Sequence, residues 1–221
     1  MEMDIKKTAN LLINFTLRRL AEISGIIIFF AGTFLFIALF SYSPEDPNFI
    51  FSKDTEIQNL LGFQGSFISD LFFQSFGFIA YLISLTYIIT GINLFRIKEF
   101  FIIIENTFIV ILYSIIGTLF LSHFYSDAFT LYINGNGGFV GNYFSQTFLG
   151  SIVLLNEKLI YYILILVIIA LFLISINFHP IKFYNSLFKI IKFFLKKENK
   201  SYTDKSELIS EYIPQEQIKN L

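Results

Sequence analysis

The chain contains 221 residues, of which 55% are hydrophobic and only 15% are charged, and its formal net charge is −1. A soluble protein of this length has more charge and less apolar surface, so the composition excludes an ordinary soluble domain. The chain contains no cysteine, which also excludes a disulfide framework and a thiolate metal site. We therefore expect an all-α integral membrane protein.

The first apolar segment follows a pair of arginines, Arg18 and Arg19. Residues 23–44 then carry no charge, and a helix of this length crosses a hydrocarbon core of about 30 Å. Pro44 and Pro47 disfavour helix in the residues that precede them. Because arginines beside a span favour the cytoplasmic side, we expect this first span to run outward.

Three further uncharged segments are long enough to cross a membrane, which predicts a four-transmembrane-helix bundle with interfacial amphipathic helices. The predicted spans are residues 20–41, 71–95, 107–124 and 158–177. The predicted connecting segments are a cytoplasmic tail (1–19, with an interfacial helix from 10 to 20), a periplasmic loop (42–70, with a short surface helix from 56 to 61 that ends at Gly62), a cytoplasmic turn (96–106), a Gly-rich periplasmic loop (125–157), a basic juxtamembrane helix (178–197) and a polar linker or tail (198–221).

Lysine and arginine are unevenly distributed among these segments. Fourteen of the 16 lie in segments that four spans place inside the cell, and the exceptions are Lys53 and Lys158. Positive residues near spans favour the cytoplasmic side. The bias predicts that both termini are cytoplasmic (N-in/C-in), whereas an odd number of spans would put one terminal cluster outside.

The long uncharged segment before the last span is not predicted to be a span itself. A turn cluster of Asn and Gly interrupts it at residues 134–138. A half-apolar helix lying flat at the outer interface, from about residue 139 to 149, fits the pattern that follows. A re-entrant loop is the alternative.

The segment after the fourth span has the pattern of an amphipathic helix. From residue 181 to 197, apolar and aromatic side chains recur on one half of a helix. The opposite half carries the candidate lipid head-group ligands Lys182, Lys189, Lys192 and Lys196. Such a helix is expected to lie along the membrane and contact anionic lipids. The alternative is a helix that packs on a cytoplasmic domain.

The sequence contains no phosphate-binding Gly-x-x-x-x-Gly-Lys loop and no His-Glu-x-x-His zinc motif. Its two histidines, His123 and His179, are predicted at opposite faces of the membrane, so they cannot share a metal. Asp70, Glu105 and Lys158 are predicted at span ends, where their side chains reach water, and this disfavours transport. We expect no catalytic, cofactor or metal site; a small transporter or channel subunit, or a generic membrane scaffold, is the alternative function.

Small residues recur at helical spacing within the predicted spans. Small side chains let helix backbones approach closely in lipid, where packing drives association. The helix-packing candidates are Gly25, Gly32, Gly77, Ser84, Gly91, Ser114, Gly117 and Thr118. Such stripes hold one bundle together or join copies of the chain, and both possibilities stay open.

Four short motifs follow one another between residues 18 and 177. They are Arg18-Arg19-Leu20 with Ser41-Tyr42-Ser43-Pro44-Glu45-Asp46-Pro47, Asn59-Leu60-Leu61-Gly62 with Gly65 and Asp70-Leu71, Phe76-Gly77-Phe78-Ile79-Ala80-Tyr81, and Gly137-Gly138-Phe139-Val140-Gly141 with Leu149-Gly150. In order and spacing they resemble the N-terminal membrane region of the FtsK/SpoIIIE DNA translocases, where Ser-Tyr-x-Pro-x-Asp-Pro follows the first span.

The resemblance implies a four-span domain that anchors a hexameric cytoplasmic ATPase, which pumps DNA through the closing division septum. The implied location is the bacterial inner membrane, enriched at the septum. The implied partners are the lipid bilayer, further copies of the chain (a hexamer) and septal division proteins. DNA, ATP and Mg would belong to a motor domain whose motifs are absent here, so we expect a fragment or a stand-alone anchor that is no enzyme by itself.

The segment after the first span carries the candidates for partner binding. These are Ser41, Tyr42, Ser43, Pro44, Asp46 and Pro47. An equally good interpretation is a helix end followed by a tight turn that binds no partner.

Overall fold

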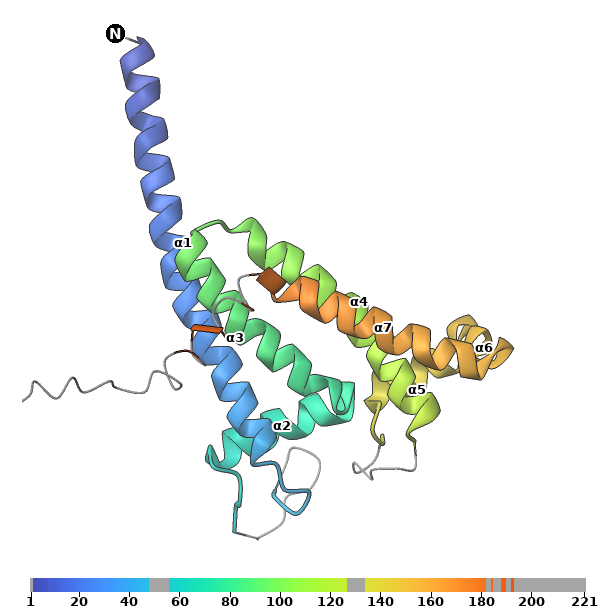
Figure 1. Ribbon diagram of the computed structural model, residues 1–221. Coiled ribbons are helices and arrows are strands. Elements are labelled where there is room, and N and C mark those ends of the chain that lie inside the picture. The colour runs from blue at the N-terminus through green and yellow to red at the C-terminus, as the bar shows by residue number, and fades with distance from the viewer. Residues whose placement is uncertain are drawn as a thin grey trace, which may run out of the picture. The chain divides into compact units, whose positions relative to one another are not determined.

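The computed structural model describes residues 2–47, 56–126 and 134–181, together with residues 184, 188, 189 and 192 (Figure 1). Seven helices occur in these ranges, with no strand among them. They are α1 (Glu2–Phe40), α2 (Gly62–Phe76), α3 (Ile79–Ile97), α4 (Phe101–Phe124), α5 (Gly138–Ser145), α6 (Phe148–Leu155) and α7 (Glu157–Ser175). The chain forms two units, residues 1–178 and 179–221, and each is described by itself.

Four of these helices are long and apolar enough to cross a membrane. The candidate spans are Asn10–Phe40 within α1, Ile79–Ile97, Phe101–Phe124 and Glu157–Ser175. The prediction of an all-α protein with four membrane-spanning helices is therefore confirmed. The side of the membrane on which each terminus lies stays a prediction.

The first helix is longer than the sequence suggested. We expected a separate interfacial helix before the first span, but α1 runs without a break from Glu2 to Phe40. No glycine or proline occurs before Gly25 to interrupt it. A side-chain hydrogen bond also spans one turn of the helix here, since Thr16 Oγ1 donates to the Leu12 carbonyl at 2.9 Å.

The predicted second span is divided into two helices. We expected a short surface helix over residues 56–61 that ends at Gly62, and one long helix over residues 71–95. Instead residues 56–61 are not helical, α2 begins at Gly62 and ends at Phe76, and α3 follows it. Gly77 has a φ of 56°, a conformation that side chains other than glycine rarely adopt. Its Cα also lies against the Asn136 carbonyl, where any Cβ would collide. Both constraints end α2 at this position.

The turn between the second and third predicted spans is shorter than the predicted 96–106. Helix α3 ends at Ile97, and Lys98 caps it in the left-handed conformation (φ 65°), its N–H donating to the Leu94 carbonyl at 2.9 Å. Helix α4 already begins at Phe101. Glu105, which we expected near a span end, lies in the second turn of this helix and is exposed. Its carboxylate is therefore not buried in the protein.

Two short helices take the place of the single interfacial helix predicted at 139–149. Helix α5 ends at Ser145, and Thr147 has an extended backbone (φ −92°, ψ −178°). The Thr147 Oγ1 accepts from the Leu149 N–H at 3.4 Å and so begins α6. Asn156 begins α7 in the same way, since its Oδ1 accepts from the Leu159 N–H at 3.2 Å.

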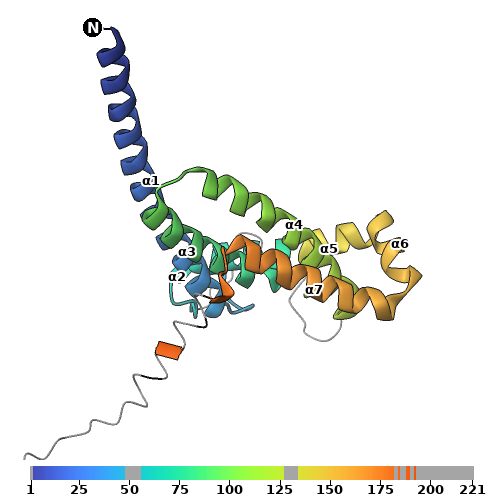
Figure 2. The same cartoon turned by 45° about the horizontal axis from the view of Figure 1, so that its top comes forward.

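Helices α1 and α3 pack against each other over most of the length of α3 (Figures 1 and 2). A Cβ on Gly25 would lie 2.8 Å from the Phe95 amide nitrogen and 2.9 Å from the Gly91 carbonyl oxygen. A Cβ on Gly32 would lie 2.8 Å from the Ile88 amide nitrogen. The two backbones therefore approach as closely as glycine allows.

The contacts along this pair run in opposite directions in the two helices. Near one end, Lys98 Nζ lies 2.6 Å from Glu22 Oε1. Near the other, the Tyr81 hydroxyl donates to the Leu39 carbonyl at 3.0 Å. The pair is antiparallel, as two consecutive crossings of a membrane require.

Replacing Gly91 by leucine should separate α1 from α3, because a Cβ there would lie 2.5 Å from the Phe29 amide nitrogen and 2.7 Å from the Gly25 carbonyl oxygen. Overpacking a close contact costs about 1–3 kcal/mol. We expect the purified protein in detergent to aggregate at a lower temperature than the wild type.

The matched control is Ile92→Leu, which puts the same side chain at the next position, where 41% of the residue is exposed. This variant should aggregate at the wild-type temperature. Equal aggregation temperatures for the two variants would show that the fold does not depend on the glycine contact.

Candidate functional site

The segment after α1 and the start of α2 form a cluster of hydrogen-bonded polar groups, which we call the Asp46 cluster: Ser41, Tyr42, Asp46, Asn59, Ser66 and Asp70. Asp46 is 3% exposed and Asn59 is 4% exposed. The Asp46 carboxylate accepts from the backbone N–H of Gln58 at 2.8 Å and from that of Asn59 at 2.9 Å. It thereby joins the two ends of the loop between α1 and α2.

Further hydrogen bonds tie the same loop to both helices. Asn59 Nδ2 donates to the Ala38 carbonyl in α1 at 2.9 Å. Ser41 Oγ accepts from the Leu60 N–H at 3.1 Å. The Ser66 hydroxyl in α2 donates to the Pro47 carbonyl at 2.9 Å. The end of α1, the loop and the start of α2 are thus one hydrogen-bonded unit.

Asp70 belongs to this unit and does not reach water as its predicted place at a span end implied. It is 7% exposed, and the Tyr42 hydroxyl donates to its Oδ1 at 3.3 Å. The Tyr42 ring also packs on Phe73, with 4.8 Å between ring centroids. The carboxylate is buried because α2 is a helix packed beneath the loop rather than the start of a span.

The predicted motif divides into a hydrogen-bonded part, in which Asp46 is buried, and an exposed part. Ser41, Tyr42, Asp46 and the Pro47 carbonyl make the contacts above. Ser43 Oγ accepts from the Glu45 N–H at 3.4 Å, and Pro44 and Glu45 are exposed at the turn. The segment is a folded turn, in which the Asp46 N–H donates to the Ser43 carbonyl at 3.2 Å, whereas partner binding by the turn stays a prediction.

A second polar cluster lies where the Gly-rich loop meets α4. Asn136 is 1% exposed, and its side-chain N–H donates to the Tyr125 carbonyl. The backbone carbonyl of Asn136 accepts from the Phe78 N–H at 3.1 Å. Gly137 and Gly141 lie directly against the backbone of α4, with no room for a Cβ. The glycines of the Gly-Gly-x-x-Gly motif therefore serve packing. Asn136 was not predicted as a site residue, although the Asn-Gly repeat marked the turn.

The predicted helix-packing residues make their contacts within one chain. Gly25, Gly32 and Gly91 join α1 to α3, and a Cβ on Gly117 would meet the Ile79 side chain of α3. The remaining candidates are buried: Gly77, Ser84, Ser114 and Thr118. Contacts of these residues between copies of the chain are untested.

A hydrogen-bonded network between α3, α4 and α7 was not predicted. Thr86 Oγ1 lies 3.0 Å from the Tyr113 hydroxyl and 3.2 Å from Ser175 Oγ. Asn106 Nδ2 donates to Thr90 Oγ1 at 2.8 Å. A signal was present, because Thr86 and Thr90 stand four residues apart, and Asn106 and Tyr113 seven apart, each pair on one helix face.

The remaining charged and basic candidates are spread over both units. In the first unit, His123 Nε2 lies 3.7 Å from Glu157 Oε1. His179 belongs to the second unit. Within the described ranges no group of three or more His, Asp or Glu is arranged to hold a metal. Lys189 and Lys192 are exposed and helical; Lys182 and Lys196 lie outside the described residues, so the amphipathic helix and its lipid contacts stay predictions.

Replacing Asp46 by alanine should destabilise the protein, because the buried Asn59 N–H loses its acceptor. An unsatisfied buried donor costs about 1–3 kcal/mol. We expect a lower aggregation temperature and faster proteolysis between residues 42 and 61.

Glu45→Ala is the control, since it removes a carboxylate from the exposed neighbouring position. It should leave both measurements unchanged. If Asp46→Ala behaved like this control, the carboxylate would have no structural role and a partner-binding role would be favoured.

The comparisons with known proteins agree with this architecture. The family described as "4TM region of DNA translocase FtsK/SpoIIIE" matches residues 17–184. Over 174 residues the chain is 28% identical to "DNA translocase FtsK" of Rickettsia typhi and 29% identical to that of Rickettsia prowazekii. Each match covers 78% of this chain and 22% of the relative. A protein of the same name from Azospirillum brasilense is 35% identical over 79 residues, which is 35% of this chain and 12% of the relative.

No solved structure matches the chain. The family match covers all four candidate spans apart from the start of α1, and with them the Asp46 cluster and the Gly-rich loop. The chain is thus a multi-pass membrane protein, and it belongs to the family of the 4TM region of the DNA translocases FtsK/SpoIIIE.

Proposed function

We propose that the chain is the membrane-anchoring and assembly domain of an FtsK-type DNA translocase, acting in cell division and chromosome segregation at the septum. The family match across the four membrane-spanning helices carries this proposal. The matched region covers only 22% of the Rickettsia relatives, whose name describes a DNA translocase. DNA translocation is therefore proposed for a motor outside the matched region, and ATP and Mg would bind there.

The fold suits a positional role. The glycine contact between α1 and α3, together with the Asp46 cluster, joins α1, the start of α2 and α3 into one packed element. Such an element can present a fixed surface to division proteins outside the membrane. Helix α7 is followed in sequence by the basic segment that we expect to contact anionic lipids on the cytoplasmic side.

The proposed topology predicts two accessible positions on opposite sides of the membrane. The chain has no native cysteine, so single substitutions at the exposed residues Glu45 and Glu99 are clean reporters. In intact spheroplasts a membrane-impermeant maleimide should label Glu45→Cys and leave Glu99→Cys unlabelled until the membrane is permeabilised. The reverse pattern, or equal labelling of both, would contradict the N-in/C-in orientation.

The anchoring role is tested by a domain exchange in living bacteria. This chain would replace the four-span region of an FtsK-type translocase in a bacterium that divides only when that protein is present. We expect division to be restored and a fluorescent fusion to gather at midcell.

The matched variants are Gly91→Leu, which should fail, and Ile92→Leu, which should restore division. Membrane fractionation checks that each protein is inserted. Inserted Ile92→Leu protein that spreads evenly around dividing cells would count against a septal role.

A further inference from the structure

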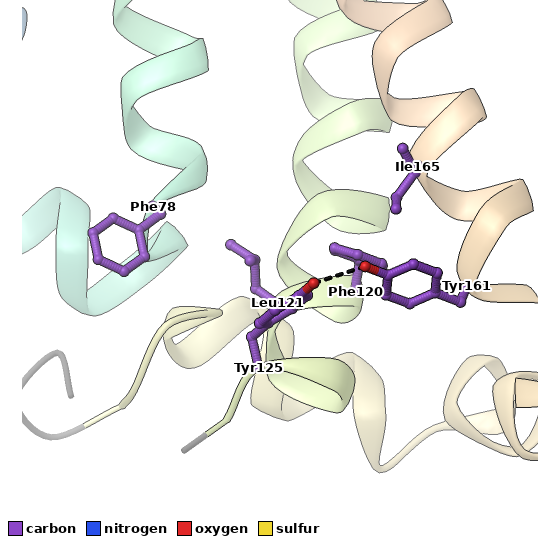
Figure 3. A pocket seen from close by; sticks show the side chains of 6 residues that line it. All are labelled: Phe78, Phe120, Leu121, Tyr125, Tyr161 and Ile165. Atoms are coloured by element: carbon purple, nitrogen blue, oxygen red, sulfur yellow. Dashed lines mark hydrogen bonds between the residues drawn. The ribbon is translucent and has the colours of Figure 1, made fainter. Parts of the chain in front are cut away.

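A cleft of about 410 Å³ lies between the ends of three membrane-spanning helices (Figure 3). Its lining residues are Phe78, Phe120, Leu121, Tyr125, Tyr161 and Ile165. They come from the turn before α3, the last turns of α4 and the first half of α7. The walls are aromatic and aliphatic, and the polar atoms that the view shows are the two tyrosine hydroxyls.

The cleft follows from the way the three helices are joined. The hydrogen bonds between α3 and α7 lie near the end of α7, where Thr86 meets Ser175 at 3.2 Å and Asn93 Nδ2 donates to the Ile176 carbonyl at 3.5 Å. At the start of α7 the contacts are to α4 instead. There the hydroxyls of Tyr125 and Tyr161 lie 2.7 Å apart. A wedge between α3 and α7 is left at this end.

The position of the tyrosines gives the depth of the cleft in the membrane. Tyr125 caps α4, and Tyr161 is in the second turn of α7, so both mark the ends of candidate spans. Tyrosine is typical of the membrane–water interface, where its ring is in an apolar layer and its hydroxyl reaches polar groups. Ile165 lies one helical turn further into the span. The cleft therefore leads from the interface into the hydrocarbon.

The residue that follows the cleft wall on α7 faces lipid. Leu166, next to Ile165, is 68% exposed, and an exposed leucine within a membrane-spanning helix contacts lipid. Water is a poor occupant of an apolar cleft, because it would have few polar partners there. The neighbouring hydrocarbon chains are the occupant that this environment supplies.

We propose that this cleft binds one acyl chain of a membrane phospholipid, whose ester or phosphate oxygens lie at the tyrosine pair. Within the pair one hydroxyl donates to the other, and the second hydroxyl hydrogen is available to an acceptor on the lipid. A bound lipid of this kind fills the wedge between α3 and α7 and stabilises the bundle at its outer end. The proposal rests on the membrane location of the chain and goes beyond its anchoring role.

Native mass spectrometry tests the proposal on the full chain. The protein is reconstituted in vesicles of phosphatidylethanolamine and phosphatidylglycerol, extracted in detergent and weighed with its retained lipid. We expect one phospholipid per chain in the wild type. Ile165→Trp, which adds volume inside the cleft, should lose it, and the control Leu166→Trp, which adds the same side chain on the exposed face, should keep it. Equal retention in the two variants, or no retained lipid in the wild type, would overturn the proposal.

A second measurement uses a variant that changes the cleft little, so that the proposal can be tested even if Ile165→Trp fails to fold. The chain has no native tryptophan, so Phe78→Trp introduces a single reporter on the wall of the cleft. Phospholipids brominated on their acyl chains should quench its fluorescence. The quenched fraction should stay the same when the protein-to-lipid ratio in the vesicles is lowered. Fluorescence that brominated lipid leaves unchanged means that water or a segment of a second copy fills the cleft, and this outcome also refutes lipid binding.

Discussion

The close approach of α1 and α3 is the constraint on which the rest of the first unit depends. In lipid there is no hydrophobic driving force between helices, so van der Waals packing must hold them together. Gly25, Gly32 and Gly91 permit backbone contact along the pair. The resulting register puts Glu22 beside Lys98 and Leu39 beside Tyr81. It therefore fixes where α1 ends relative to α2 and where α3 turns into α4.

The polar network adds specificity to this packing rather than most of its strength. Hydrogen bonds between membrane helices contribute on average about 0.6 kcal/mol each, which is less than the cost of disturbing one close glycine contact. Thr86, Tyr113 and Ser175 nevertheless have few alternative partners in hydrocarbon. Their bonds select one arrangement of α3, α4 and α7, and the wedge beside Tyr161 is a consequence of that arrangement.

Properties that depend on local sequence were predicted, and those that depend on distant contacts were not. Hydropathy gave the number of spans, and the spacing of Gly25, Gly32 and Gly91 indicated packing faces. The break at Gly77 could not be read from its apolar surroundings, because it depends on the Asn136 carbonyl almost 60 residues away. Asp70 was placed in water for the same reason. An uninterrupted apolar segment does not reveal that its first residues fold back as a separate helix beneath the loop.

The Asp46 cluster shows why the two interpretations of the motif after α1 need not exclude each other. Asp46 is buried and satisfies two backbone donors, so it cannot itself present a charged surface to a partner. Pro44 and Glu45, which directly precede Asp46, are exposed. A turn held on both sides by hydrogen bonds loses little conformational entropy when it binds. If a division protein contacts this segment, the exposed turn makes the contact, while the buried aspartate and its partners determine the shape of the turn.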